Sequence, residues 1–315
     1  NDYDTLFTAE GISDHFIWAD DGNNIKLITL ADPEGWPLPG FIGGSHLDVY
    51  LQSGKIRQYS LCNDPENFSQ YVIAVQEEKD GRGGSIEMHG LKEGMIVPVS
   101  LPRNQFSLAN SMRHIFVAGG IGITPFLSMI PKLISDKVDW ELHICAQSET
   151  KIPCQSLLKI YDGNINIFKH LSQDGTRLSI KDIVTSTKDN EHLYFCGPGS
   201  MIDEAVENGA ELGDRLHFEK FGVDENLDDA AYEVVLKKSG RVIQVPKGQT
   251  MLGALRFADV DVPASCEGGI CLECKTRFFE GTPIHRDLVM KPVDRESFLT
   301  LCVSGCASKS IELDL

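Results

Sequence analysis

Cysteines near the end of the chain have the type and spacing to bind a redox metal centre. Cys266, Cys271 and Cys274 lie in SCEGGICLEC, and Cys302 follows in LCVSGC. The spacing C-x4-C-x2-C, followed by a long gap and another cysteine, is typical of a plant-type 2Fe–2S cluster. The glycines at 268–269 let the loop curl and leave backbone N–H groups free to face the sulfurs. Such a cluster carries one electron at a time, so the sequence predicts electron transfer with these cysteines as metal ligands.

Two other interpretations of these cysteines stay open. The C-x2-C pair also suits zinc, and buried thiols can share a spacing by chance. Zinc sites usually use paired C-x2-C knuckles, and the spacing of Cys302 and Cys306 does not supply the second one. We therefore expect Cys302 to be the ligand and Cys306 to be a spectator. The other cysteines are expected to be free thiols of a reducing cytoplasm: Cys62, Cys145, Cys154 and Cys196.

Composition excludes several classes of function. The chain has 315 residues, a length typical of two or three domains. Its formal net charge of −17 argues against nucleic-acid binding, which needs a basic patch. No apolar run is long enough to span a bilayer and no signal-peptide pattern is present, so we expect a cytoplasmic protein without a membrane partner.

Three segments differ in their patterning. Residues 1–106 carry short apolar stretches bounded by turn signals, which indicates a small antiparallel β-barrel or sandwich. Residues 107–222 alternate apolar strands with helical patterns, which is typical of a parallel α/β sheet. Residues 223–231 are acidic, which predicts a linker. Residues 232–315 hold a predicted hairpin around Ser239-Gly240, a short helix and the cysteine loop, and we expect a separate cluster domain.

Two glycine-rich turns are candidates for nucleotide binding. The first, GGIGITPF, follows a predicted strand and opens a predicted helix, where free N–H groups can bind phosphate. The second, CGPGSM, follows another strand at the same edge of the sheet. Close strand–helix packing and a plain β-to-α turn explain these motifs equally well. The residues concerned are Gly119, Gly120, Gly122, Thr124, Pro125, Cys196, Gly197 and Pro198.

Two further motifs suit a flat redox ring with a phosphate tail. In RQYSL, Tyr59 offers an aromatic face, Ser60 a hydroxyl group and Arg57 a positive charge. In GRGGS, Arg82 and Ser85 flank glycines that can form a backbone nest for phosphate. An ordinary strand and an ordinary turn are the alternatives.

Taken together and in this order, the motifs resemble the phthalate dioxygenase reductase-type family of the ferredoxin–NADP reductase superfamily. The resemblance covers nearly the whole chain and includes HFEKFG and the closing string from His285 to Leu315. It implies an N-terminal flavin-binding antiparallel β-barrel, a central NADH-binding parallel α/β domain and a C-terminal ferredoxin domain of the β-grasp type. The implied boundaries are 1–106, 107–222, a linker at 223–231, and 232–315.

The resemblance also implies cofactors and their contacts. The flavin would be FMN, because GRGGS matches the FMN-containing members. Ala74 and Val75 would flank the ring, Thr124 and Cys196 would lie near the nicotinamide, and Phe221 would cover the ring. The residues implied to hold FMN are Arg57, Gln58, Tyr59, Ser60, Ala74, Val75, Gly83, Gly84, Ser85 and Phe221. Those placed in the reaction itself are Ser60, Thr124, Cys196 and Phe221.

The implied reaction joins a two-electron donor to a one-electron acceptor. NADH delivers a hydride, and a flavin can take two electrons together and release them singly. Where many relatives carry an arginine for the dinucleotide, this chain has Gln147, and Lys151 is a possible substitute. The lack of an arginine there favours NADH over NADPH.

The implied partner is a Rieske-type non-haem iron oxygenase, which would receive electrons from a monomeric reductase. The rim of the cluster loop, Glu267–Glu273, is the predicted docking surface. Alternatives are a reductase for another monooxygenase, a cluster-based redox sensor and a free flavin reductase. A sensor would not need a complete flavin and nicotinamide site, and a free flavin reductase would leave the cluster domain unexplained.

Overall fold

The chain is seen here in a computed structural model. It describes the residue ranges 7–9, 19–20, 24–79, 81, 83–221, 229–264, 268–269 and 272–315. The chain divides into two compact units, Asn1–Glu219 and Lys220–Leu315. Among the described residues, no helix combines the length and the hydropathy that crossing a bilayer requires.

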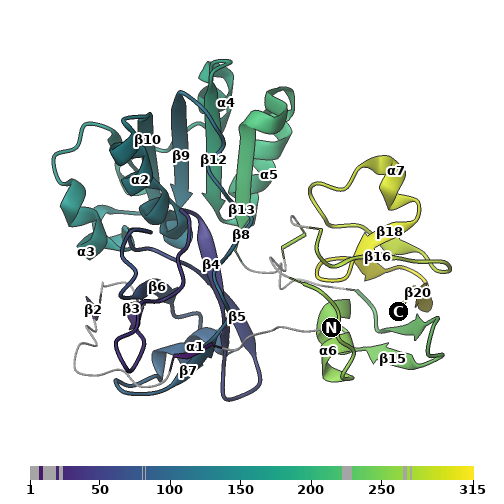
Figure 1. Cartoon of the computed structure of the whole chain (residues 1–315). Coiled ribbons are helices and arrows are strands. Elements are labelled where there is room, and N and C mark those ends of the chain that lie inside the picture. The colour runs from purple at the N-terminus through teal and green to yellow at the C-terminus, as the bar shows by residue number, and fades with distance from the viewer. Residues whose placement is uncertain are drawn as a thin grey trace. The chain divides into compact units, whose positions relative to one another are not determined.

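The first unit begins with a β-barrel made of two sheets (Figure 1). One sheet has the order β1-β7-β4-β5, with β8 paired to β4, and the other has the order β2-β3-β6. Their elements are β1 (Phe7–Ala9), β2 (Ala19–Asp20), β3 (Ile25–Leu30), β4 (Ser45–Tyr50), β5 (Ile56–Ser60), β6 (Tyr71–Gln76), α1 (Gly84–His89), β7 (Val97–Val99) and β8 (Arg103–Asn104).

A single hydrophobic core fills the barrel. Ile28 and Ile73 of one sheet pack with Leu47 and Val99 of the other. These β-branched and leucine side chains recur at every second position, so each strand turns its apolar face inward. A bridge between Leu61 and Ile73 continues the pairing from the end of β5 to β6. All pairings between barrel strands for which a register is known are antiparallel.

The first unit continues into an α/β sheet of order β11-β10-β9-β12-β13. Strand β9 pairs in parallel with β10 and β12, and β10 pairs in parallel with β11. The elements are β9 (Arg113–Gly119), η1 (Gly120–Ile123), α2 (Thr124–Asp136), β10 (Asp139–Ala146), η2 (Glu149–Lys151), α3 (Gln155–Leu158), η3 (Lys159–Tyr161), β11 (Ile167–Leu171), η4 (Ser172–Asp174), α4 (Ile180–Ser186), β12 (Glu191–Gly197), α5 (Gly199–Asn208), η5 (Ala210–Arg215) and β13 (Leu216–Lys220).

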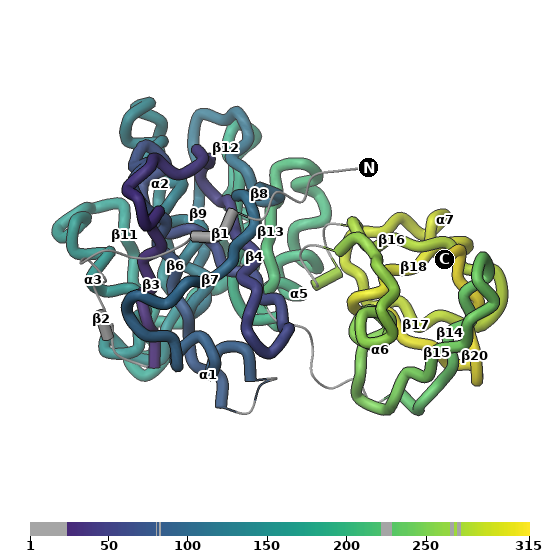
Figure 2. Tube along the Cα trace, turned by 60° about the horizontal axis from the view of Figure 1, so that its bottom comes forward, coloured from purple at the N-terminus to yellow at the C-terminus, as the bar shows by residue number. Residues whose placement is uncertain are grey.

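The strand order reverses between β9 and β12. The chain runs outward from β9 through β10 to β11, and then returns to β12 on the other side of β9 (Figures 1 and 2). Open α/β sheets bind ligands outside the carboxyl ends of their strands at such a switch point. Both glycine-rich turns of the sequence follow these two strands.

The second unit is a small β-grasp fold. Strand β14 pairs antiparallel with β15 and parallel with β20, which gives the order β15-β14-β20. Helix α6 packs Met251 and Leu255 into the core beside this sheet. The elements are β14 (Tyr232–Leu236), β15 (Val242–Val245), α6 (Met251–Phe257), β16 (Lys275–Arg277), β17 (Pro283–Ile284), α7 (Pro292–Arg295), β18 (Phe298–Thr300), β19 (Gly305–Cys306) and β20 (Ser310–Leu313).

Candidate functional site

Two of the predicted cluster ligands converge in the second unit. Strands β16 and β18 pair antiparallel, with Lys275 opposite Thr300, so Cys274 before β16 comes close to Cys302 after β18. Their sulfurs lie 3.3 Å apart, and both residues are buried. The predicted ligands Cys266 and Cys271 lie outside the described residues.

The separation of these sulfurs fits two ligands of one metal. A disulfide would need about 2.05 Å. Two thiolates held about 2.3 Å from one tetrahedral metal lie a little under 4 Å apart. The distance between Cys274 and Cys302 is close to the second value. The residues present therefore fit an iron–sulfur centre.

The Cys306 thiol makes hydrogen bonds to backbone carbonyl groups. It donates toward the carbonyl oxygens of Ser308, at 3.2 Å, and Ser310, at 3.6 Å. Cys306 lies on β19, where it pairs with Pro283. This arrangement supports the interpretation of Cys306 as a spectator, with Cys302 as the ligand.

The predicted flavin residues of β5 and β6 lie on neighbouring strands of the barrel. Arg57, Tyr59 and Ser60 lie on β5, and the Leu61–Ile73 bridge carries this strand alongside β6, which holds Ala74 and Val75. Gln58 lies on the same stretch of β5. Ser60 is buried. Burial also raises the pKa of Tyr59 to about 12, so its hydroxyl stays protonated. A flat apolar surface with polar atoms at its edge is what an isoalloxazine ring requires.

The GRGGS motif forms the entrance to helix α1. Gly83 has φ of +79° and Gly84 opens the helix. A Cβ at Gly84 would overlap the guanidinium of Arg57, so the arginine lies directly against the helix backbone. The Ser85 hydroxyl accepts a hydrogen bond from the Glu78 N–H at 2.9 Å. This contact orders the approach to the turn, and Arg82 lies outside the described residues.

Sequence reasoning did not find Lys26 and His89, which fix helix α1 to the barrel. Lys26 is buried on β3, and its ammonium donates to the carbonyl oxygens of His89 and Leu91, at 2.9 and 2.8 Å. The His89 ring donates to the carbonyl oxygen of Val75 at 2.8 Å. These bonds join the C-terminal end of helix α1, which begins at the predicted phosphate turn, to β3 and to β6, the strand that carries Ala74. The signal in the sequence for this anchor was a lysine inside the otherwise apolar strand IKLITL.

The two nucleotide turns pack backbone against backbone at the switch point. A Cβ at Gly122 would overlap the carbonyl oxygen of Cys196. A Cβ at Gly197 would come within 2.9 Å of Gly119 Cα, and one at Gly119 within 2.6 Å of Pro198 Cδ. Close packing therefore accounts for the glycines at positions 119, 122 and 197. Such packing was one of the interpretations that the sequence left open for these turns.

Gly120 is different, because nothing crowds it. Its φ is +53°, a region that favours glycine, and no atom lies within 4 Å of the position its Cβ would take. It sits where the strand β9 ends and the turn into α2 begins. The open side of the first turn is thus at Gly120, next to the helix start. This is the place where a pyrophosphate can approach the backbone.

Helix α2 connects the nucleotide turn to the barrel. Thr124 is buried and donates from its hydroxyl to Ile121 O at 3.0 Å, and Pro125 follows in the first turn. The Ser128 hydroxyl accepts a hydrogen bond from Gly44 N at 3.0 Å. A Cβ at Gly43 would lie 2.7 Å from Met129 Cα. The helix that would carry the nicotinamide turn is therefore held against the barrel that would hold the flavin.

Cys196 does not have the properties of a nucleophile. It is fully buried near the end of β12. Burial raises the pKa of its thiol well above the ordinary value, and the charge of Glu219 raises it further. Phe221 follows β13 directly and is half-buried. Both residues can shape an apolar site but cannot transfer protons at neutral pH.

A further arginine lies near the position where the sequence lacks one. The backbone N–H of Gln173 donates to the carbonyl oxygen of Gln147 at 3.0 Å, which ties the loop after β11 to the loop after β10. Burial raises the pKa of Cys145 to about 11, against an opposing contribution from Arg177 in this loop. Lys151 is exposed on η2. Arg177 was not considered in the sequence interpretation, because its loop starts from a different strand.

Comparisons with known proteins identify the domains and the family. The model of the 2Fe-2S iron-sulfur cluster binding domain matches residues 234–307, and that of the oxidoreductase NAD-binding domain matches residues 116–207. The vanillate O-demethylase oxidoreductase of Pseudomonas sp. (strain HR199 / DSM 7063) is 38% identical over 93% of this chain and 96% of its own length. The phthalate 4,5-dioxygenase oxygenase reductase subunit of Pseudomonas putida is 36% identical over 91% of each chain.

A solved structure matches over the same extent. The structure of phthalate dioxygenase reductase superposes with a TM-score of 0.78 at 33% identity, and the match covers 98% of this chain and 97% of that one. The agreement extends through the barrel, the α/β sheet and the cluster-binding fold.

Proposed function

This chain belongs to the phthalate dioxygenase reductase family, and we propose that it is the reductase component of a Rieske-type non-haem iron oxygenase system. It takes a hydride from NADH onto FMN and passes single electrons through a 2Fe–2S cluster to the oxygenase. The observation that carries this function is the 3.3 Å approach of the Cys274 and Cys302 sulfurs in a chain that also has an NAD-binding sheet. We assign it as a monomer of the cytoplasm, and the buried free thiols support a reducing compartment.

Each proposed domain binds a different redox group or substrate. Residues 1–106 hold FMN, 107–222 bind NADH, 223–231 link the units and 232–315 hold the cluster with Cys266, Cys271, Cys274 and Cys302 as ligands. When bound, FMN accepts the two electrons of a hydride together and releases them singly, as a one-electron cluster requires.

The chain's own residues bind and orient the two rings. Arg57, which lies against the backbone of Gly84, would supply positive charge for the flavin phosphate. Ser60 would offer a hydroxyl group to the edge of the flavin ring, and Tyr59 would pack beside the ring. No side chain would have to move a proton, because hydride transfer needs only that the donor carbon and the acceptor nitrogen be held in line.

On the nicotinamide side, the turn at Gly120 leaves backbone room for the dinucleotide, with Thr124 at the start of α2, and Gly197 lets the second turn pack closely against Gly119. The protonated thiol of Cys196 contributes packing without competing as a nucleophile. Phe221 is the aromatic residue that would cover the flavin ring. The partner surface remains the proposed rim of the cluster loop, residues 267–273.

The decisive experiment is an anaerobic NADH titration of the purified chain, followed by visible absorbance and low-temperature EPR. Flavin bleaching together with the rhombic signal of a reduced 2Fe–2S cluster is expected. Flavin reduction without that signal would contradict the proposed path. Many turnovers with ferricyanide are expected of a reductase, whereas a redox sensor would reduce the acceptor slowly or only once.

A further inference from the structure

An ion pair lies on the turn that carries Cys302. The guanidinium of Arg286 binds the carboxylate of Asp229 through two bonds, of 2.5 and 2.9 Å. The same guanidinium donates to the carbonyl oxygen of Val303 at 3.2 Å. The Asp229 side chain is only 11% exposed and that of Arg286 27%. Such a pair is less screened by solvent than an ordinary surface pair.

Gly305 makes room for this pair. A Cβ at this glycine would overlap the Asp229 carboxylate and would lie 2.8 Å from Arg286 Nη1. The two charged groups therefore rest directly on the backbone that follows Cys302. Any larger residue at this position would push the pair away from the turn.

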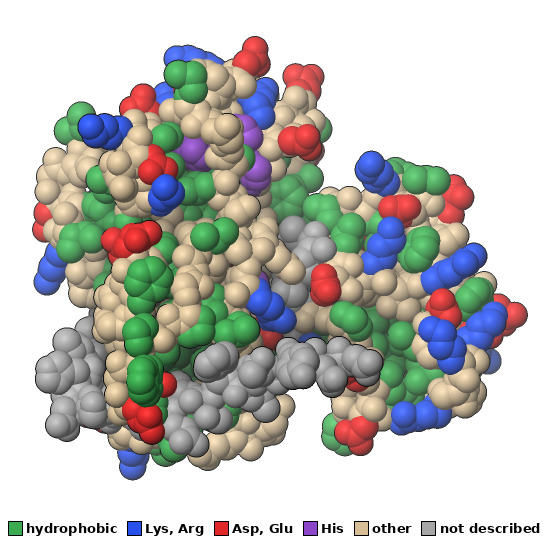
Figure 3. Space-filling view, in the orientation of Figure 1, with side chains coloured by type: hydrophobic (Ala, Val, Ile, Leu, Met, Phe, Trp, Pro, Cys, Tyr) green, Lys and Arg blue, Asp and Glu red, His purple; other side chains and the backbone are tan. Residues whose placement is uncertain are grey.

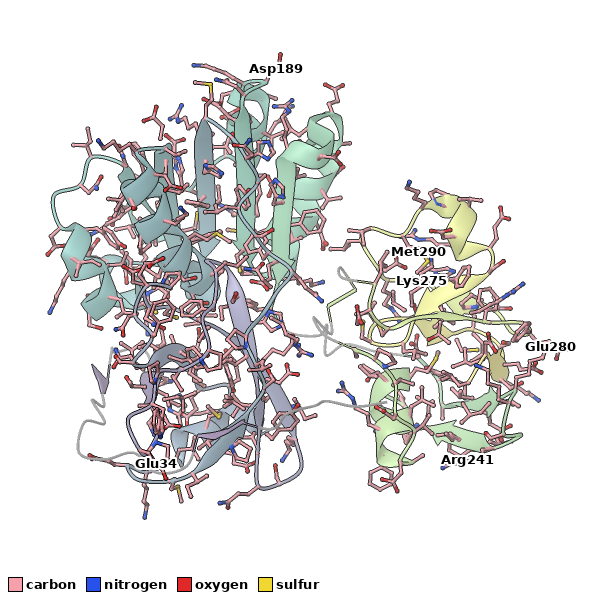
Figure 4. All side chains as sticks on the ribbon, in the orientation of Figure 1. Glu34, Asp189, Arg241, Lys275, Glu280 and Met290 are labelled. Atoms are coloured by element: carbon pink, nitrogen blue, oxygen red, sulfur yellow. The ribbon has the colours of Figure 1, made fainter. Side chains whose placement is uncertain are left out.

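The two residues after Arg286 lie against the other part of the ligand loop. The Asp287 carboxylate is buried and accepts from the Met290 N–H at 2.9 Å and from Arg295 Nη2 at 3.0 Å (Figure 4 labels Met290). The neighbouring Leu288 N–H donates to Gly269 O at 3.1 Å. A Cβ at Gly269 would lie 2.7 Å from Val303 Cγ2 and 3.0 Å from Asp287 Cα.

The segment 286–288 thus contacts both loops that bear cysteine ligands. Through Leu288 it holds the glycine turn between Cys266 and Cys271, and through Arg286 it holds the turn after Cys302. Asp229, which pairs with Arg286, lies in the stretch that the sequence analysis predicts to be a linker. Its contacts place it with the cluster domain.

We propose that Asp229 and Arg286 are positioning residues that set the charge next to the cluster and thereby its reduction potential. The inference rests on the proposed function. Reduction adds one electron and hence one negative charge at the cluster, with no bond broken and no proton taken up by these residues. The cation of Arg286 stabilises that added charge, and the carboxylate of Asp229 offsets the stabilisation. Net charge and hydrogen bonding around a cluster are known determinants of its potential.

A purely structural role makes a different prediction. If the pair only shapes the turn, removing either partner changes cluster content and stability in the same way. If the pair sets local charge, the two removals shift the potential in opposite directions. Asp229→Asn is nearly isosteric and removes only the charge, whereas Arg286→Gln also removes the guanidinium fork, so Arg286→Lys, which loses the fork but keeps the charge, is needed beside it to separate charge from shape.

The test is an EPR-monitored redox titration of the full-length holoprotein, with iron and sulfide analysis of each variant. Asp229→Asn is expected to shift the midpoint potential to more positive values and Arg286→Gln to more negative values. The double variant, with the charge balance restored, is expected near the wild type. Lys238→Gln is the matched control, since Lys238 pairs with Asp314 in the same unit but is exposed.

Arg286→Lys keeps the charge and is expected to keep the potential close to that of the wild type. If Arg286→Gln assembles no cluster, Asp229→Asn and Arg286→Lys still decide the question. Potentials that all match the Lys238→Gln control, or that all shift in one direction, would overturn the inference. A wild-type protein without a 2Fe–2S signal would instead overturn the proposed function.

Discussion

The ammonium group of Lys26 holds the end of helix α1 through the carbonyl oxygen of His89, at 2.9 Å. The lysine is buried on β3, the middle strand of the sheet of order β2-β3-β6. Burial lowers its pKa, and it remains the donor for the carbonyl of Leu91 as well. Because helix α1 begins at the GRGGS turn, Lys26 fixes the position of the predicted phosphate site without touching it.

We predict that Lys26→Met loosens FMN binding. The methionine fills the same space but leaves two carbonyl oxygens without their donor, at a cost of about 1–3 kcal/mol each. The expected result is partial loss of FMN on gel filtration and a lower unfolding midpoint. Exposed Lys92, also near α1, supplies the control variant Lys92→Met. FMN retention equal in both variants would show that the anchor is dispensable.

Arg177 is the residue we expect to replace the missing arginine at position 147. We predict that Arg177→Gln raises the KM for NADH by about three- to tenfold and changes kcat little, because a charged hydrogen bond on an exposed loop contributes about 1 kcal/mol. Steady-state kinetics with ferricyanide measure both constants. The exposed Lys181 on α4 provides the control, Lys181→Gln. An unchanged KM in Arg177→Gln would place the adenosine half elsewhere.

A group of imidazoles in the α/β sheet makes stability depend on pH. His192 Nδ1 and His217 Nε2 lie 2.8 Å apart, and Tyr194 stacks on His217 at 4.2 Å. Figure 3 shows histidine side chains gathered at the surface of this part of the molecule. Burial, with the neighbouring His192 and His114, lowers the pKa of His217 to about 4, against an opposing effect of Asp214. Burial also lowers the pKa of His114 and of His192, the latter with Arg215 contributing.

These lowered values destabilise the fold in acid. Between pH 6.5 and 4 the unfolded chain binds more protons at these imidazoles than the folded chain does, so stability is full above pH 6.5 and falls as the pH drops. One such proton corresponds to about 1.4 kcal/mol per pH unit. We predict that His217→Gln flattens this dependence.

Urea unfolding followed by tryptophan fluorescence tests this prediction, because all three tryptophans, Trp18, Trp36 and Trp140, belong to the first unit. Lys132→Gln, an exposed change in the same sheet domain, should leave the slope unaltered. The same slope in His217→Gln and the wild type would contradict the prediction.

Local patterns were enough to predict much of the fold. The apolar runs IKLITL and YVIAVQ form β3 and β6 with the bounds expected, and the hairpin at Ser239-Gly240 forms with φ of +69° at Gly240. Strand periodicity and turn residues act within a few positions of each other, so a single sequence carries their signal.

The contacts that complete the site depend on distant residues. Lys26 meets His89 across 63 positions and Asp229 meets Arg286 across 57, so neither pairing has a local signature. Helix α1 was missed for a related reason, since GRGGS predicts a turn and the helix that follows is fixed by Lys26. Arg177 reaches Cys145 only because β10 and β11 are neighbours in the sheet.

The choice between Cys302 and Cys306 gives the sharpest prediction for the cluster. The Cys302 and Cys274 sulfurs lie 3.3 Å apart. The Cys306 thiol instead donates toward the carbonyl oxygens of Ser308 and Ser310. We predict that Cys302→Ser abolishes the 2Fe–2S absorbance and EPR signal while flavin reduction by NADH persists, because the two units carry the two centres separately.

Cys306→Ser is the matched control, since it removes one buried thiol four positions away and leaves the ligand set intact. It is expected to keep at least most of the cluster and a reduced-state EPR spectrum of the wild-type shape. The hydroxyl of the new serine can donate to the same carbonyl oxygens, so little stability should be lost. Loss of the signal in Cys306→Ser, with its retention in Cys302→Ser, would reverse the assignment and make Cys306 the ligand.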